Sequence, residues 1–176
     1  MDPVFTQITA IALSLLFAAA GLQKLFLRES FRQVLAGYQL LPNRILNLAS
    51  LVIPMAEITL AACLIFPQTR AIGALAAALL LSVYGFSIWV NLKRGNLSLD
   101  CGCQLGQSTQ TISQALVYRN VMLASVTLIL LIPQSIREIT LYDYGAVAFG
   151  LVITCLLYAI LNTQIANANF IREINT

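Results

Sequence analysis

The sequence contains no histidine and few charged residues, and these two absences narrow the classes of protein it can encode. Of its 176 residues, 59% are hydrophobic and 10% are charged, with a formal net charge of +3. Histidine is the commonest metal ligand and a frequent general base, so its absence argues against most hydrolases and zinc sites. An average soluble domain has about 25% charged residues, and the sequence also lacks the basic runs that bind nucleic acids. The composition therefore predicts a membrane protein with several spans and no nucleic-acid partner.

Five apolar runs separated by polar segments account for most of the chain. They cover, approximately, residues 4–24, 45–66, 71–90, 115–132 and 144–161. A helix of about 20 apolar residues crosses the hydrocarbon layer of a bilayer, and the amphipathic residues 30–38 are typical of a helix lying on the membrane surface. We therefore predict an all-α fold, a polytopic membrane helical bundle. It has four core transmembrane helices plus a fifth, and a short interfacial helix after the first. Residues 1–161 form its single domain and residues 162–176 a polar, loosely ordered C-terminal tail.

Two cysteines separated by one residue stand in the longest polar connection, which reads Asp100-Cys101-Gly102-Cys103. A disulfide needs Cα atoms roughly 4.4–6.8 Å apart, and Gly102 lets the backbone bend because it adopts φ > 0 without steric cost. A ring this tight is strained, and strained, exposed disulfides exchange readily. The pair therefore predicts thiol–disulfide chemistry. The alternatives are two unrelated loop cysteines, or a C-x-C pair that captures a metal ion.

Charged residues near this pair bear on its reactivity. Asp100 disfavours a neighbouring thiolate, whereas Lys93, Arg94 and Arg119 could favour it. Arg119 stands close to the start of the fourth apolar run, so it either extends to the membrane interface or faces inward toward the thiols. We favour the inward orientation.

One acidic residue, Glu57, lies deep in the second apolar run. It is roughly 18 Å along the helix from Ile45, near the bilayer midplane, where an ionisable residue indicates function by default. The alternative is a structural tie to Lys24 at the end of the first run. Tyr84 and Trp89 are candidate walls for a flat aromatic ligand, although aromatic residues near the end of a span are also typical of the membrane interface.

Basic residues predict an orientation in the membrane. With five spans, one side carries Arg70 and Arg137, and the other carries Lys24, Arg28, Arg32, Arg44, Lys93, Arg94 and Arg172. This excess places the second side, with the cysteine pair, in the cytoplasm. Stable disulfides instead favour the oxidising side of the membrane, so the two arguments oppose each other.

An ordered set of residues between about positions 17 and 132 carries a family resemblance. The set comprises Phe17-x-x-x-Gly21-Leu22-x-Lys24-Leu25, Phe31, Tyr38-x-Leu40-Leu41-Pro42, Pro54-x-x-Glu57, Tyr84, Asn91-Leu92-x-Arg94-Gly95, Asp100-Cys101-Gly102-Cys103 and Arg119-Asn120. It resembles the methylamine-utilisation protein MauE family, which is similar to DoxX-like membrane proteins. The resemblance implies a multi-pass protein of the bacterial inner membrane that is tied to thiol redox chemistry. It also implies a thioredoxin-like partner and a disulfide-rich client, such as the small subunit of methylamine dehydrogenase.

The bundle also resembles the DsbB and vitamin K epoxide reductase architecture, which implies a quinone as candidate cofactor. Those oxidoreductases use C-x-x-C and a second pair of loop cysteines. Here the pair is C-x-C, and Cys63 and Cys155 lie inside apolar runs.

Three functions compete at this point. The first is a membrane thiol–disulfide oxidoreductase that works through Cys101 and Cys103, with Lys24 and Glu57 carrying protons or shaping a cavity. The second is a non-catalytic membrane assembly factor. The third is a soft-metal transporter, because thiolate pairs suit ions such as Cu(I).

Overall fold

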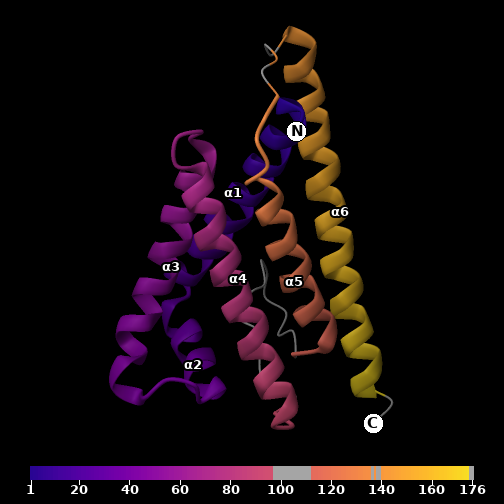
Figure 1. Cartoon of the computed structure of the whole chain (residues 1–176). Helices are drawn as coiled ribbons and strands as arrows, with labels where there is room; N and C mark the ends of the chain where they lie inside the picture. Colours follow the sequence, from indigo (N-terminus) through magenta and orange to yellow (C-terminus); the bar gives the residue numbers. More distant parts are fainter. Residues whose placement is uncertain (97–111, 136, 138–139, 175–176) are drawn as a thin grey trace.

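The computed structural model describes residues 1–96, 112–135, 137 and 140–174. These residues form six helices: α1 (Pro3–Phe26), α2 (Arg28–Tyr38), α3 (Asn43–Ile65), α4 (Arg70–Lys93), α5 (Gln114–Ile129) and α6 (Leu141–Ile174) (Figure 1). Among the described residues, α1, α3, α4 and α6 are long and apolar enough to cross a membrane. The predicted all-α membrane bundle is thereby confirmed, with α2 as the short helix after the first span.

Small residues let α1 and α4 approach α3 closely. A Cβ added to Gly21 of α1 would lie 2.9 Å from the backbone oxygen of Pro54 in α3. A Cβ added to Gly73 of α4 would lie 2.9 Å from the Cβ of Cys63. Close approach of backbones at small residues is the usual way in which membrane helices pack. The positions of α1 and α4 against α3 therefore depend on these two glycines.

The last two helices differ in length from the prediction. The run predicted at 115–132 corresponds to α5, which has only 16 residues and is shorter than α1, α3, α4 and α6. In addition, α6 does not end at residue 161 but continues to Ile174, through the segment expected to be a loosely ordered tail. Residues 162–174 contain neither glycine nor proline, so no residue in this segment favours ending the helix.

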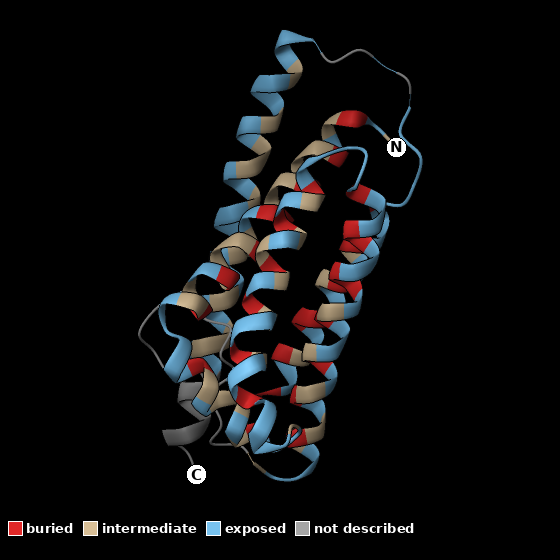
Figure 2. Cartoon of the chain, turned by 90° about the vertical axis from the view of Figure 1, so that its left-hand side faces the viewer, coloured by how far each residue is buried: buried red, intermediate tan, exposed pale blue. Residues whose placement is uncertain are grey.

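The outermost helix is α6, which packs mainly against α1. Within its described span Leu141–Ala168 none of the side chains in the most apolar stretch is buried, and Figure 2 shows the helix exposed along its length. Apolar residues on such a surface suit contact with lipid.

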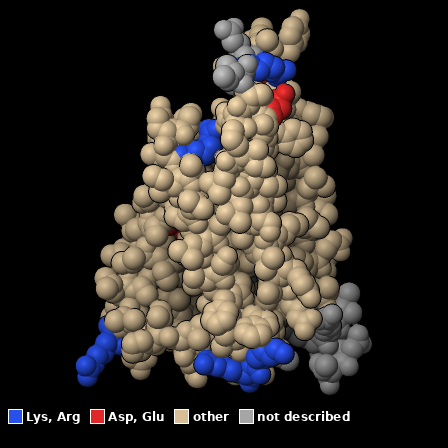
Figure 3. Space-filling view, viewed as in Figure 1, with Lys and Arg blue, Asp and Glu red and all other residues tan. Residues whose placement is uncertain are grey.

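Basic side chains lie mainly at the two ends of the bundle, and the wide band between them is almost uncharged on the face in Figure 3. At the lower end, Arg28 donates to the backbone oxygen of Asn47 at 3.0 Å and ties α2 to α3. At the upper end, the buried guanidinium of Arg70 donates to the oxygens of Leu64 and Ile65, both at 3.1 Å. Arg70 thus satisfies carbonyl groups at the C-terminal end of α3 that have no partner within the helix.

Candidate functional site

Three polar side chains from three helices meet inside the bundle. Lys24 of α1 and Glu57 of α3 form an ion pair, with only 5% and 1% of their side chains exposed. The hydroxyl of Tyr84 in α4 donates to the same carboxylate oxygen, Oε1, at 2.7 Å. The Lys24 ammonium also lies 3.4 Å from the Tyr84 hydroxyl. A charge buried in a membrane protein needs such partners, so the three residues form one polar cluster.

Aromatic rings surround the ammonium of Lys24. Its Nζ lies 4.7 Å from the centre of the Tyr84 ring and 5.4 Å from that of Phe31 in α2. Contacts between a cation and an aromatic face within about 6 Å are attractive, and more so when water is excluded. The short helix α2 therefore covers the cluster as well as lying at the end of the bundle.

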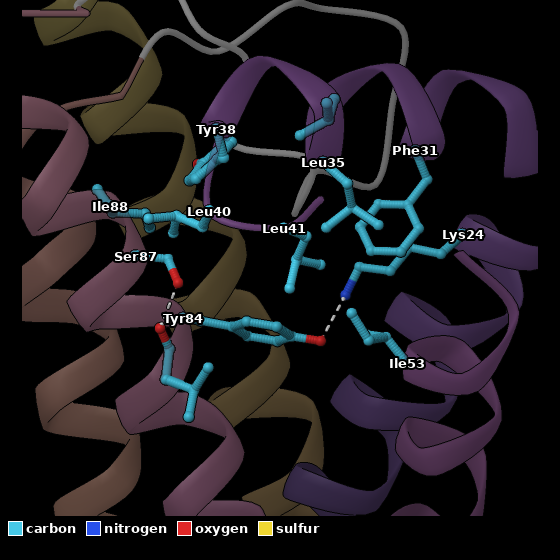
Figure 4. Close-up of a pocket in the computed structure, with 12 residues that line it drawn as sticks. Lys24, Phe31, Leu35, Tyr38, Leu40, Leu41, Ile53, Tyr84, Ser87 and Ile88 are labelled. Atoms are coloured by element: carbon cyan, nitrogen blue, oxygen red, sulfur yellow. Dashed lines mark hydrogen bonds between the residues drawn. The ribbon is translucent and has the colours of Figure 1, made fainter. Parts of the chain in front are cut away.

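Lys24 and Tyr84 of this cluster line a large, mostly apolar cavity of about 290 Å³. Its lining comes from α1, α2, α3, α4 and the segment after α2, and comprises Lys24, Phe31, Val34, Leu35, Tyr38, Leu40, Leu41, Ile53, Val83, Tyr84, Ser87 and Ile88. Figure 4 shows the Lys24 ammonium and the Tyr84 hydroxyl beside each other among these apolar side chains. Apolar walls with a few converging polar groups are typical of a small-molecule site.

A second, smaller cavity of about 40 Å³ lies on another side of the same cluster. Lys24, Glu57 and Tyr84 line it together with Arg119 of α5 and Tyr158 of α6. Arg119 is 8% exposed, and its Nη1 donates to Asn162 Oδ1 at 2.7 Å. Arg119 is thus buried beside the Lys24–Glu57 cluster, whereas the thiols toward which it was expected to face lie outside the described residues.

The remaining described candidates lie outside the cluster. Arg94 follows α4 and donates to the backbone oxygen of Tyr38 at 3.5 Å. Trp89 is 46% exposed, lies outside the lining of the large cavity, and has the Lys93 ammonium 5.9 Å from its ring. Tyr84 and Trp89 thus do not form two walls of one cavity, although Tyr84 does line it.

Comparison with known proteins identifies the family. The family model described as "Methylamine utilisation protein MauE" matches residues 2–133, about three quarters of the chain. The chain belongs to the MauE family. No solved structure matches it.

Curated relatives agree with this assignment. A MauE protein of Paracoccus versutus is 43% identical over 116 residues, which cover 66% of this chain and 62% of that protein. The MauE protein of Paracoccus denitrificans is 34% identical over 128 residues, 73% of this chain and 69% of that protein. The MauE protein of Methylophilus methylotrophus is 30% identical over 159 residues, 89% of this chain and 84% of that protein. All three are named methylamine utilization protein MauE.

Cys101 and Cys103, the pair predicted to carry the redox chemistry of this MauE-family protein, lie with Asp100 and Gly102 in residues 97–111, outside the described part of the chain. The two other cysteines are described, and neither forms a disulfide with another described residue. Cys63 is half-buried on α3. Cys155 is exposed on α6 and lines an outer groove between α1, α5 and α6.

Sequence reasoning missed the contribution of α6. Tyr158 lines the small cavity, and Asn162 binds Arg119. The spacing of Tyr158 and Asn162 could have predicted this contribution. Residues four positions apart lie on the same face of a helix, so these two residues place their polar groups on one face of a mostly apolar helix.

Proposed function

We propose that this MauE-family protein takes part in methylamine utilisation as a membrane thiol–disulfide redox protein that works through Cys101 and Cys103. One observation carries the proposal. The described residues that flank the segment 97–111 lie beside the large cavity: Ile112 is buried in one cluster with Tyr38 and Ile88, and both of these line the cavity. Arg94, close to the start of that segment, also contacts Tyr38.

The proposed reaction is an exchange of one disulfide for another. The thiolate of one cysteine attacks the disulfide of a thioredoxin-like partner and releases one partner thiolate. The second cysteine then attacks the mixed disulfide and releases the other. Two electrons pass from the Cys101–Cys103 dithiol to the partner, and the two protons lost by the dithiol are taken up by the partner's thiolates. In the opposite direction, a dithiol of the client reduces the Cys101–Cys103 disulfide: the client gains one disulfide during its maturation, and the pair takes up its two electrons and two protons. We place this exchange in the bacterial inner membrane.

Arg94 and Lys93 support this chemistry by position. Both lie at the end of α4 from which the segment 97–111 starts, and a nearby positive charge favours the reactive thiolate. Arg119 donates to Asn162 and lines the small cavity. It therefore connects α5 to α6, besides the role expected from the sequence, in which its positive charge favours the thiolate.

A quinone is compatible with the large cavity. An ammonium carries three N–H donors, and among the described residues Lys24 has two hydrogen-bond partners, Glu57 and Tyr84. A third donor remains for a ligand carbonyl at the polar wall of an otherwise apolar site. A quinone held there by the Lys24 ammonium, beside the Tyr84 ring, would supply a two-electron acceptor.

Complementation separates this function from its competitors. In a methylamine-using bacterium that lacks its own MauE gene, we expect Cys101→Ser and Cys103→Ser each to abolish growth on methylamine. Cys63→Ala and Cys155→Ala serve as matched controls and should grow normally. In parallel, Cys103→Ser should accumulate a mixed disulfide through Cys101 that is visible on a non-reducing gel.

The opposite outcome has a clear meaning. If the double variant Cys101→Ser/Cys103→Ser still supports growth at the normal rate, the redox proposal is wrong and a non-catalytic assembly factor explains the family role. The soft-metal transporter has less support, because the apolar runs of the sequence contain no ladder of methionine or cysteine residues that could carry a soft ion across the membrane.

A further inference from the structure

Two buried polar atoms beside the small cavity have no hydrogen-bond partner among the described residues. Glu57 Oε2 and Arg119 Nε are inaccessible to solvent and, among the described residues, have no hydrogen-bond partner. Both side chains are more than nine-tenths buried, and both line the 40 Å³ cavity. An unsatisfied buried polar group costs about 1–3 kcal/mol, and more when it is charged, so two at one place indicate a ligand that is not protein.

The chemistry of the two atoms selects the ligand. Glu57 Oε2 can only accept a hydrogen bond and Arg119 Nε can only donate one. A metal cation would lie beside the Arg119 guanidinium and the Lys24 ammonium, and an anion would lie beside the Glu57 carboxylate. Water is neutral and both donates and accepts, so it satisfies both atoms at once.

The size of the cavity agrees with this choice. A buried water needs a cavity of at least about 10–15 Å³ measured in this way, and two to four polar partners. The volume of about 40 Å³ therefore has room for roughly one to three waters. Genuinely dry cavities are lined by apolar side chains alone, whereas this one has charged residues from three helices, α1, α3 and α5.

We propose that this cavity is a hydrated site in which bound water joins the Glu57 carboxylate to the Arg119 guanidinium. The water completes a hydrogen-bonded chain across the bundle. The chain runs from Tyr84, at the wall of the large cavity, through the two oxygens of Glu57 to Arg119 and Asn162. Glu57 thereby accepts hydrogen bonds from Tyr84 and Lys24 at Oε1 and from water at Oε2.

Nuclear magnetic resonance of arginine side chains tests the site directly. The full chain is labelled with ¹⁵N-arginine in micelles, and transfer of magnetisation from water to each Nε–H is measured. The Arg119→Lys variant assigns the Arg119 signal. Arg70 is the internal dry reference, because it is 4% exposed and its Nε donates to a backbone oxygen at 3.1 Å. We expect a water cross-peak at Arg119 and none at Arg70.

A pair of matched variants shows whether the water lies in the cavity. Ala20 lines the small cavity, whereas its neighbour Ala19 lines the outer groove. Ala20→Leu should fill the site and abolish the cross-peak at Arg119, and Ala19→Leu should leave it unchanged. If the Arg70 signal shows that Ala20→Leu does not fold, Leu123→Phe fills the same cavity from α5.

Two results would overturn the proposal. The first is an Arg119 signal as silent toward water as that of Arg70, which means that the cavity is dry or filled by protein. The second is a cross-peak that survives filling of the cavity. Neither readout involves Cys101 or Cys103, so failure here leaves the proposed redox function untouched.

Discussion

Replacing Lys24 with methionine tests whether the buried ion pair holds α1 against α3. Methionine is also unbranched and of similar length, so the change removes the charge while largely keeping the volume. Glu57 would then retain the hydrogen bond from Tyr84 but lose its cation. The carboxylate is 1% exposed, so solvent cannot replace the lost partner.

The burial of both side chains sets the size of the effect. Removing one partner of a buried pair costs about 3–5 kcal/mol, because the remaining charge is left uncompensated. A hydrogen bond to a charged group contributes about 1.5–3 kcal/mol, and the one from Tyr84 survives. We therefore expect Lys24→Met to lower the free energy of unfolding by about 3 kcal/mol, at the low end of that range.

A double-mutant cycle isolates the pair from the loss of packing. Glu57→Gln keeps the shape and an acceptor for Tyr84 but leaves the Lys24 ammonium unpaired. The Lys24→Met/Glu57→Gln double variant buries no unpaired charge in the cluster, so it should be more stable than the sum of the single variants by about 2 kcal/mol, within the range for residues in contact.

Unfolding in mixed micelles with increasing dodecyl sulfate, followed by the helical circular dichroism signal, measures these differences. Arg32→Met is the matched control, since Arg32 pairs with Glu29 where 41% and 66% of the side chains are exposed. Such a surface pair contributes only about 0–1 kcal/mol. If Lys24→Met is no more harmful than Arg32→Met, or the two single effects add without coupling, our reasoning about the pair is wrong.

Three further predictions concern packing, orientation and the end of α3. Gly21→Val should destabilise the bundle by about 1–3 kcal/mol, because its side chain overlaps the backbone of α3, whereas Gly145→Ala, which meets nothing within 4 Å, should be neutral or slightly stabilising in the same unfolding assay. In a variant that keeps only Cys101 and Cys103, labelling of intact cells by an impermeant maleimide with and without reductant decides between the two orientation arguments: labelling that appears only after reductant puts an oxidised pair outside the cytoplasm, whereas labelling only after cell lysis puts the pair in the cytoplasm, as the basic residues predict. Arg70→Met should lower the free energy of unfolding by about 2–3 kcal/mol, because two carbonyls at the end of α3 lose a charged donor, and an unchanged midpoint would show that these bonds contribute little.

The sequence was most informative about spans whose apolar runs end at charged or helix-breaking residues. The run predicted at 45–66 corresponds to Asn43–Ile65, and that at 71–90 to Arg70–Lys93. Pro42 precedes the first residue of α3, and a turn follows its last residue, Ile65. Both ends of α3 are therefore predictable from the neighbouring residues alone, without knowledge of how the helices pack. By contrast, residues 162–171 of α6 contain no charged residue, glycine or proline, and the continuation of this helix could not be recognised from apolarity alone.

The site was predictable only in part, for a geometric reason. A tie between Lys24 and Glu57 was one of two alternatives, because each residue is conspicuous in or beside an apolar run. The hydroxyl of Tyr84 reaches the same carboxylate across 27 positions in the chain. That contact depends on the position of α4 along the axis of α3. The close approach of Gly73 to Cys63 fixes this position, and a sequence pattern within one helix does not predict it.

The outer position of α6 has a consequence for the order of assembly in the membrane. Helices enter the bilayer in the order of synthesis, N-terminal segments first, and α6 follows the other five helices. Until it arrives, Arg119 has no Asn162 to bind and the wall formed by Tyr158 is missing. The charged interior is therefore open to lipid until the final helix docks onto α1. A chain truncated before residue 141 would lack both Tyr158 and Asn162 and would leave the Arg119 guanidinium without these neighbours.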